Sequence, residues 1–221
     1  MCDAANTTNG FSIVKVADPQ SNEARVHGLG VAPDFFICKS TASADSWHTY
    51  WKVMGRTKYI NLNGTGPASS SDQFGSQEPD STYFYVKSNT GSGANKAGGM
   101  VYYLWNAVEQ YSSFGEYLGN GNADGPFVFL GFKPALLIIK GHDYASNWFI
   151  HDNKRPGYNV NTGPLRIAAE AELTVTTYDL DILSNGFKMR TSGGDSNQDG
   201  KNYVYMAWAS NPFQANGGLA R

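Results

Sequence analysis

The stretch that decides the fold is Leu-Gly-Phe-Lys-Pro-Ala-Leu-Leu-Ile-Ile-Lys at residues 130–140, which continues as Gly-His-Asp-Tyr-Ala-Ser-Asn-Trp to residue 148. Residues 29–47 are an earlier copy of it. Gly30 matches Gly131 and Trp47 matches Trp148 at a spacing of 101 residues (131 − 30 and 148 − 47), and a proline and a lysine between them recur at the same spacing. Self-similarity at a fixed spacing indicates a repeated structural unit.

The match continues to the end of each half of the chain. Residues 84–87 correspond to 187–190, and residues 101–105 correspond to 204–208, at a spacing of 103 (187 − 84 and 208 − 105). The halves are joined at residues 111–114 without a linker rich in proline or glycine, which favours units packed closely together. We therefore predict a flexible leader at residues 1–9, a first unit at 10–110 and a second unit at 111–221.

The composition indicates strands and turns. Charged residues make up 16% and aromatic residues 14% of the 221 residues, and 25 residues are glycine. About seven short strands in each unit, separated by frequent turn signals, are typical of a β-sandwich or a barrel. We predict an all-β fold with two tandem homologous β-sandwich units, jelly-roll-like in form, in which residues 167–173 are the one helix-prone segment.

Charge and hydropathy exclude several functions. The net charge is −2 with a pI near 6.1, and no run of lysine and arginine indicates nucleic-acid binding. No apolar run reaches the roughly 18 residues that a membrane-spanning helix needs. The first eight residues lack the pattern of a secretion signal, so we expect synthesis in the cytosol and release by lysis. Cys38 lies in an apolar run and is predicted to be a buried thiol.

One loop resembles half of a metal site. Asp195, Asn197 and Asp199, followed by glycine, fit the first half of a calcium loop. The twelfth position would be Met206, where such a loop needs a bidentate glutamate. The loop matches residues 89–93 of the first half, so a structural hairpin turn is the preferred interpretation over a calcium site, and we predict no metal and no cofactor.

Catalytic patterns are weak. Close acidic pairs such as Asp179 with Asp181 alternate with apolar residues and indicate a solvated strand face rather than a glycosidase pair. None of the four histidines adjoins a nucleophile elbow or a cysteine. We therefore predict no catalytic residues and a chain that is not an enzyme.

The repeat divides the aromatic residues into those that recur at matched positions and those that occur in one half only. Trp47 with Trp148, and likewise the tryptophans at 105 and 208, recur at matched positions and are predicted to be core residues. Trp51 is matched by an aspartate, and Tyr50 is matched by His151. Aromatic residues that occur in one unit only are the better candidates for a sugar-stacking or partner surface, although quiet packing remains the preferred interpretation for each of them.

Both halves resemble a module found in tail-fibre and other virion structural proteins of bacteriophages, marine phages above all. The resemblance is contained in residues 27–33, 111–127, 131–135, 147–148, 183–188 and 203–213, which read His-Gly-Leu-Gly-Val-Ala-Pro, Tyr-Ser-Ser-Phe-Gly-Glu-Tyr-Leu-Gly-Asn-Gly-Asn-Ala-Asp-Gly-Pro-Phe, Gly-Phe-Lys-Pro-Ala, Asn-Trp, Leu-Ser-Asn-Gly-Phe-Lys and Tyr-Val-Tyr-Met-Ala-Trp-Ala-Ser-Asn-Pro-Phe. It implies an all-β, non-enzymatic virion component. Such modules often end a longer fibre, so we expect either a piece of one or a short standalone protein.

The leading hypothesis is a tail-fibre or fibre-tip adhesin that binds a host surface glycan or protein, located in the virion beside other virion proteins and assembled as a homo-oligomer, a trimer by analogy. The alternatives are a capsid or tail decoration protein with an assembly role, a free carbohydrate-binding module, and a depolymerase or glucanase. The candidate ligand-binding residues are Tyr50, Trp51, Tyr144, Asp195, Asn197, Asp199 and Asn202.

Overall fold

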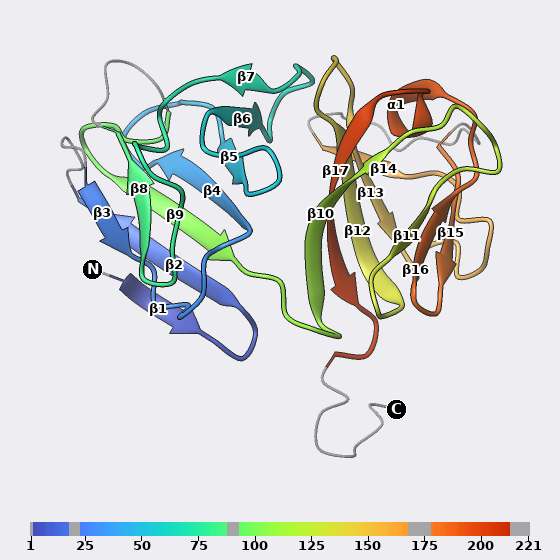
Figure 1. The fold of residues 1–221 in the computed structure, drawn as a ribbon, viewed down its shortest axis with the longest axis horizontal. Coiled ribbons are helices and arrows are strands. Elements are labelled where there is room, and N and C mark those ends of the chain that lie inside the picture. Colours follow the sequence, from blue (N-terminus) through green and yellow to red (C-terminus); the bar gives the residue numbers. More distant parts are fainter. Residues whose placement is uncertain (1, 18–22, 88–92, 168–177, 213–221) are drawn as a thin grey trace. The chain divides into compact units, whose positions relative to one another are not determined.

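The computed structural model describes residues 2–17, 23–87, 93–167 and 178–212. These residues form strands and loops with a single short helix, α1 (Gly194–Asn197), which confirms the predicted all-β fold. The chain divides into two compact units (Figure 1). Unit 1 contains Met1–Gly64 and Ala68–Ala107, and unit 2 contains Thr65–Pro67 and Val108–Arg221. No helix among the described residues is long and apolar enough to cross a membrane.

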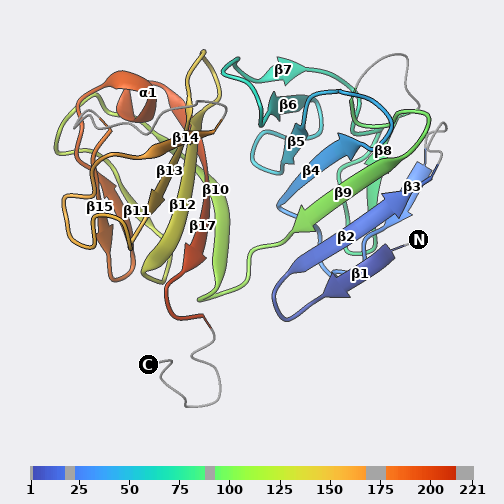
Figure 2. The same ribbon diagram turned by 180° about the vertical axis from the view of Figure 1, so that it is seen from behind.

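Unit 1 contains a large antiparallel sheet and a two-stranded sheet. Figure 2 shows the large sheet, in which the last strand of the unit lies between the second and the fourth. The large sheet has the order β1 (Cys2–Asn6), β2 (Phe11–Val16), β9 (Met100–Trp105), β4 (Phe35–Ser40), β5 (His48–Trp51), β6 (Lys58–Asn61) and β7 (Ser69–Ser70). The small sheet pairs β3 (Glu23–Val26) with β8 (Tyr83–Val86).

Unit 2 has a five-stranded and a three-stranded sheet, and its last strand is again central. The larger sheet has the order β10 (Ser112–Leu118), β17 (Asn202–Ala209), β12 (Pro134–Gly141), β13 (Trp148–Asp152) and β14 (Leu165–Ile167). The smaller sheet has the order β11 (Phe127–Phe129), β16 (Gly186–Met189) and β15 (Leu180–Leu183).

The order of strands is the same in both units. The series β2-β9-β4-β5-β6 in unit 1 corresponds to β10-β17-β12-β13-β14 in unit 2, and β3-β8 corresponds to β11-β16. The register agrees as well, because Tyr50 pairs with Phe36 and the matched His151 pairs with Leu137. Matching order and register are what a sequence repeat predicts; a common origin of the halves stays a prediction.

The core of each unit lies between its two sheets. In unit 1, Phe36 of the large sheet packs near Phe84 of the small sheet, with 5.5 Å between ring centroids. In unit 2, Phe187 of the small sheet packs against Tyr205 of the large one, at 5.7 Å. Burial alternates along β9 and β2, as expected for strands with one face on a core. Each unit is therefore organised like a sandwich.

The structure agrees with the local sequence predictions at some segments and differs at others. The segment predicted as a flexible leader includes β1, which pairs with β2, because its backbone completes the edge of the large sheet. Residues 112–114 of the predicted connection are already part of β10, and the division between the units falls after Ala107. Cys38 is a buried free thiol, as predicted, and burial raises its pKa. Most of the helix predicted at 167–173 and most of the turn predicted at 89–93 lie outside the described residues.

Trp47 is not a core residue, which corrects the prediction. Its side chain is 37% exposed, while the matched Trp148 is only 1% exposed. The difference follows from the strands: β13 begins at Trp148, whereas β5 begins one residue after Trp47. Trp105 is half-buried and stacks on Phe35, with 5.4 Å between ring centroids.

We predict that Gly186→Ala destabilises unit 2, because a Cβ at this position would lie 2.0 Å from the carbonyl oxygen of Val128 on the paired strand. The overpacking should lower the free energy of unfolding by about 1–3 kcal/mol. Gly193→Ala is the matched control, since no atom lies within 4 Å of its Cβ position and its φ of −171° suits any residue. Urea denaturation followed by far-UV circular dichroism measures both. Equal midpoints for the two variants would contradict the β11–β16 register.

We predict that acid destabilises the protein partly through His151. Burial lowers the pKa of His151 to about 4, and its Nδ1 lies 3.0 Å from Asn161 Oδ1. The unfolded chain therefore takes up the proton first, so the contribution is complete above about pH 6.5 and is lost as the pH falls toward 4, by up to about 3 kcal/mol. Urea denaturation from pH 7.5 to 4 should show a shallower decline for His151→Gln. A decline equal to that of the unsubstituted protein would contradict this role.

Candidate functional site

Four of the predicted ligand-binding residues of unit 2 lie around two loops that meet at one end of its large sheet. Tyr144 is in the loop between β12 and β13, and its hydroxyl lies 2.8 Å from that of Tyr203 at the start of β17. The same hydroxyl donates to the carbonyl oxygen of Gly194 in the loop before β17, at 3.4 Å. The ammonium of Lys201 lies 5.7 Å from the centroid of the Tyr144 ring, within the range of a cation–π contact. These contacts hold Tyr144 against the segment between β16 and β17 that contains α1, which we call the α1 loop.

Two carboxylates join these loops. Asp195 of α1 accepts hydrogen bonds from the backbone and side-chain amides of Asn147, at 3.2 and 2.7 Å. Asp143 accepts from the backbone and side-chain amides of Asn202, at 3.1 and 3.2 Å. Each carboxylate faces two N–H donors, an arrangement that fixes the loops relative to one another. Asp195 and Asn202 are therefore brought together with Tyr144; that they bind a ligand stays a prediction.

Asn197 has an internal role. Its side chain is fully buried, and Nδ2 lies within 2.6–3.1 Å of oxygens of Thr191, Asn120 and Asn122. Its Oδ1 accepts the backbone N–H of Asn120 at 3.0 Å. A buried residue cannot touch a ligand at the surface, so the prediction for Asn197 is wrong as to contact: the amide ties the α1 loop to the loop before β11. Asp199 is exposed beside that loop.

The loop does not assemble a calcium site in the described residues. There, no group of three or more histidine, cysteine, aspartate or glutamate side chains lies close enough together to hold a metal. Asp195 is engaged by Asn147, and Asn197 is turned inward. The loop begins as a helical turn. Its side chains therefore point in different directions and do not converge on one ion position.

A buried cation supports the β12–β13 loop. The ammonium of Lys140 is fully buried and donates to the carbonyl oxygen of Gly141 at 2.7 Å and to Ser146 Oγ at 3.2 Å. Burial lowers the pKa of Lys140 to about 8, while the charge of Asp195 opposes that shift. Burial also raises the pKa of Tyr144, with a further contribution from its bond to Tyr203. Both residues therefore act in this loop through hydrogen bonds that hold its shape.

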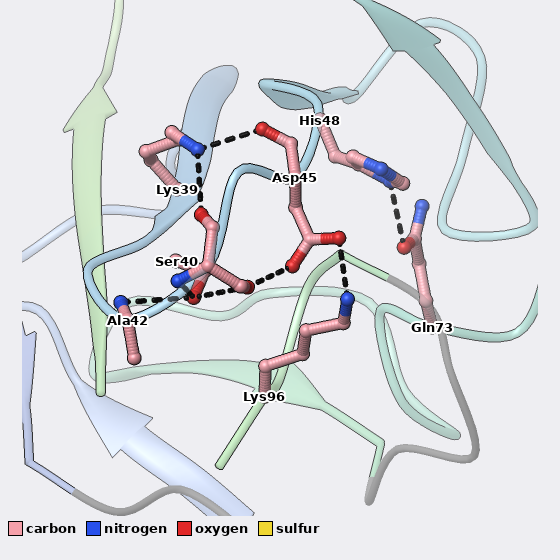
Figure 3. Close-up of polar contacts among 8 residues, drawn as sticks. Lys39, Ser40, Ala42, Asp45, His48, Gln73 and Lys96 are labelled. Atoms are coloured by element: carbon pink, nitrogen blue, oxygen red, sulfur yellow. Dashed lines mark hydrogen bonds and ion pairs between the residues drawn. The ribbon is translucent and has the colours of Figure 1, made fainter. Parts of the chain in front are cut away.

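Unit 1 has the matching pair of loops (Figure 3). Lys39, which matches Lys140, donates to the carbonyl oxygens of Ser43 at 3.2 Å and Asp45 at 2.7 Å in the loop between β4 and β5. Asp45 forms an ion pair with Lys96 from the loop before β9 and accepts a hydrogen bond from Ser43. These two contacts hold the pKa of the Asp45 carboxyl below its usual value. In unit 1 the carboxylate of Asp45 lies on the hairpin loop, while in unit 2 Asp143 lies on the hairpin loop and Asp195 on the opposite one.

The serine, histidine and aspartate of this cluster do not form a catalytic triad. His48 Nδ1 lies 3.0 Å from Gln73 Oε1, and the ring stacks on Tyr59 at 4.7 Å between centroids. Asp45 is instead bound to Lys96 and Ser43. A triad requires the carboxylate to orient the histidine, and here an amide does so. Burial lowers the pKa of His48, so the ring is neutral at pH 7.

Tyr50 and Trp51 are not surface residues, which corrects the prediction. Their exposed fractions are 1% and 0%. β5 pairs with β4 in a register that places Tyr50 opposite Phe36 and Trp51 opposite Phe35, and each pair of rings is packed together. The matched residue of unit 2, His151, is also buried, and its Nδ1 has a hydrogen-bonding partner within that unit. A polar residue at the matched position therefore did not indicate that Tyr50 is exposed.

The residues at the matching end of unit 1, Trp47, Asp45 and Lys96, were not among the candidates predicted from the sequence. Lys39 connects them: its ammonium lies 5.8 Å from the centroid of the Trp47 ring and donates to the carbonyl oxygen of Asp45, whose carboxylate pairs with Lys96. The charge of Asp45 and of Lys96 is visible in the sequence, but their pairing across 51 positions is not. A signal was present in the six small or acidic residues before Trp47, which are typical of an exposed hairpin loop.

Comparison with known proteins places the chain in a family. Residues 2–212 match the family described as Domain of unknown function (DUF7483). The chain belongs to this family. The match to DUF7483 spans both units, so the family's domain contains the two sandwich-like units together. A search of curated proteins and a search of solved structures returned no match.

We predict that Asn197→Ala lowers the free energy of unfolding by about 2–3 kcal/mol, because buried oxygens of three residues lose their donor. Asp199→Ala, two residues away and exposed, is the control and should change it by less than about 0.5 kcal/mol. Chemical denaturation of the full chain compares the two variants. An unaltered midpoint for Asn197→Ala would show that water replaces the amide.

Proposed function

We propose that the chain is a bacteriophage virion structural protein, a tail-fibre or fibre-tip adhesin that binds a glycan or protein on the host surface. The observation that supports this best is the rigid pair of loops at the end of unit 2. Six hydrogen bonds join the β12–β13 loop to the α1 loop and the start of β17. A loop that is held in one conformation loses less entropy on binding, and binding residues commonly lie on loops that a scaffold positions.

The residues of the virion-protein resemblance support a scaffold. His27 is fully buried: its Nδ1 accepts the N–H of Leu29 at 3.1 Å, and its Nε2 lies 3.0 Å from the carbonyl oxygen of Asp80. The carbonyl oxygen of Asn185 accepts the N–H groups of Leu130 and Gly131, at 2.9 and 3.2 Å. These motif residues form turns and hydrogen bonds that connect strands. They therefore support a scaffold on which loops are exposed for binding.

The proposed mechanism is multivalent recognition. Single sites of modest affinity suffice when several copies act together, because the second contact is made at a high effective concentration. A trimeric fibre would supply that valency, and Tyr144, Asp195, Asp199 and Asn202 would face the ligand from unit 2. Asp143 and Lys201 join this set, because they contact Asn202 and Tyr144.

Immunogold electron microscopy with antibodies against the purified chain tests the assignment on virions whose genome contains the gene. We expect label at the distal end of the tail or its fibres. Label distributed over the capsid lattice would replace the adhesin by a decoration protein with an assembly role, and virions without label would reject a virion component. Antibody first absorbed with the purified chain is the control for specific labelling.

A further inference from the structure

Trp47 of unit 1 and Trp148 of unit 2 occupy matched positions but have different environments. Both follow a hairpin loop at the start of the fourth matched strand region, 101 residues apart (148 − 47). Trp148 pairs with Lys140 inside the sheet and is 1% exposed, whereas Trp47 precedes β5 and is 37% exposed. Packing in the core therefore explains the tryptophan of unit 2 and not that of unit 1.

Trp47 is nevertheless held in place. Its backbone N–H donates to Asn63 Oδ1 at 3.0 Å, and its carbonyl oxygen accepts the N–H of Leu62 at 2.8 Å. The ammonium of Lys39 lies 5.8 Å from the centroid of the indole ring and is anchored on two loop carbonyl oxygens. An exposed aromatic side chain on a fixed backbone offers a large contact area at a low cost in conformational entropy.

The residues around Trp47 are polar. Ser43 and Asp45 of the β4–β5 loop and Lys96 of the loop before β9 form one hydrogen-bonded group, and Asn63 presents an amide from the loop after β6. A partner protein would favour a continuous apolar patch, whereas here hydroxyl, carboxylate, ammonium and amide groups surround a single indole. That combination fits a sugar, which has an apolar C–H face and a rim of hydroxyl groups.

We propose that unit 1 has a sugar-binding site in which the exposed indole of Trp47 stacks on a pyranose ring and the Asp45–Lys96 pair bonds to its hydroxyl groups. The site deepens the proposed adhesin role, on which it rests, by naming a surface polysaccharide as the ligand. Lys39 and Lys96 against Asp45 leave one net positive charge around the ring, so acidic sugars should bind more tightly than neutral ones.

A printed array of bacterial capsular polysaccharides and lipopolysaccharide O-chains tests the site with the purified full chain. We expect binding to at least one polysaccharide, and a loss of about tenfold in affinity for Trp47→Ala, as the removal of an aromatic contact of this kind predicts. Trp47→Phe should retain part of the affinity, because it preserves an aromatic face. Tyr83→Ala is the matched control, since Tyr83 is 38% exposed in unit 1 on β8, and it should bind like the unsubstituted protein.

Trp47→Ala leaves the backbone bonds of residue 47 in place, so its fold should be unchanged, and circular dichroism checks this. An array without any binding, or binding that Trp47→Ala and Tyr83→Ala weaken equally, would overturn the sugar site. Binding that survives Trp47→Ala and is lost in Asp195→Ala would place recognition in unit 2, retaining the adhesin and rejecting the Trp47 site. The virion-labelling result does not depend on Trp47, so the failures of the two proposals are distinguishable.

Discussion

The insertion of the last strand of each unit between two earlier ones is the constraint on which the rest of the structure depends. β9 pairs with β2 on one side and β4 on the other, and β17 pairs in the same way with β10 and β12. Antiparallel pairing then requires the loop before the last strand to end beside the hairpin loop that follows β4 or β12. The two loops of each unit meet because of this topology and not because of their own sequences.

The two units use this meeting point differently. In unit 1 the carboxylate of Asp45 lies on the hairpin loop and pairs with a lysine, while in unit 2 the carboxylate of Asp195 lies on the opposite loop and binds an amide. The lysine that precedes the hairpin loop is common to both, and its ammonium donates to that loop in each case: to the carbonyl oxygens of Ser43 and Asp45 in unit 1, and to Ser146 Oγ in unit 2. The lysine is the same in both units, but the carboxylates and their partners differ. The loop surfaces can therefore differ while the sheets beneath them remain alike. Two units of one architecture can therefore present two different surfaces.

Much of the fold could be predicted, because strand patterns are local. The all-β class, the buried thiol of Cys38 and the matched strands of the two halves all follow from apolar runs and turn signals. Of the candidate ligand-binding residues, Tyr144, Asp195 and Asn202 lie together, and their role in binding stays a prediction. The predictions for Tyr50 and Trp51 were wrong, because comparison of two copies shows where they differ but not which side chains pack on the position.

The sequence by itself determined the period of the repeat, the strands and the faces that pack inward, since these depend on the alternation of apolar residues along a few neighbours. Only the tertiary structure decided which aromatic residues reach the surface. Trp47 and Trp148 are tryptophans at matched positions of the two halves, but exposure is a property of the atoms around a side chain. Those atoms come from segments remote in sequence, as with Asn63 beside Trp47, and no local pattern records them.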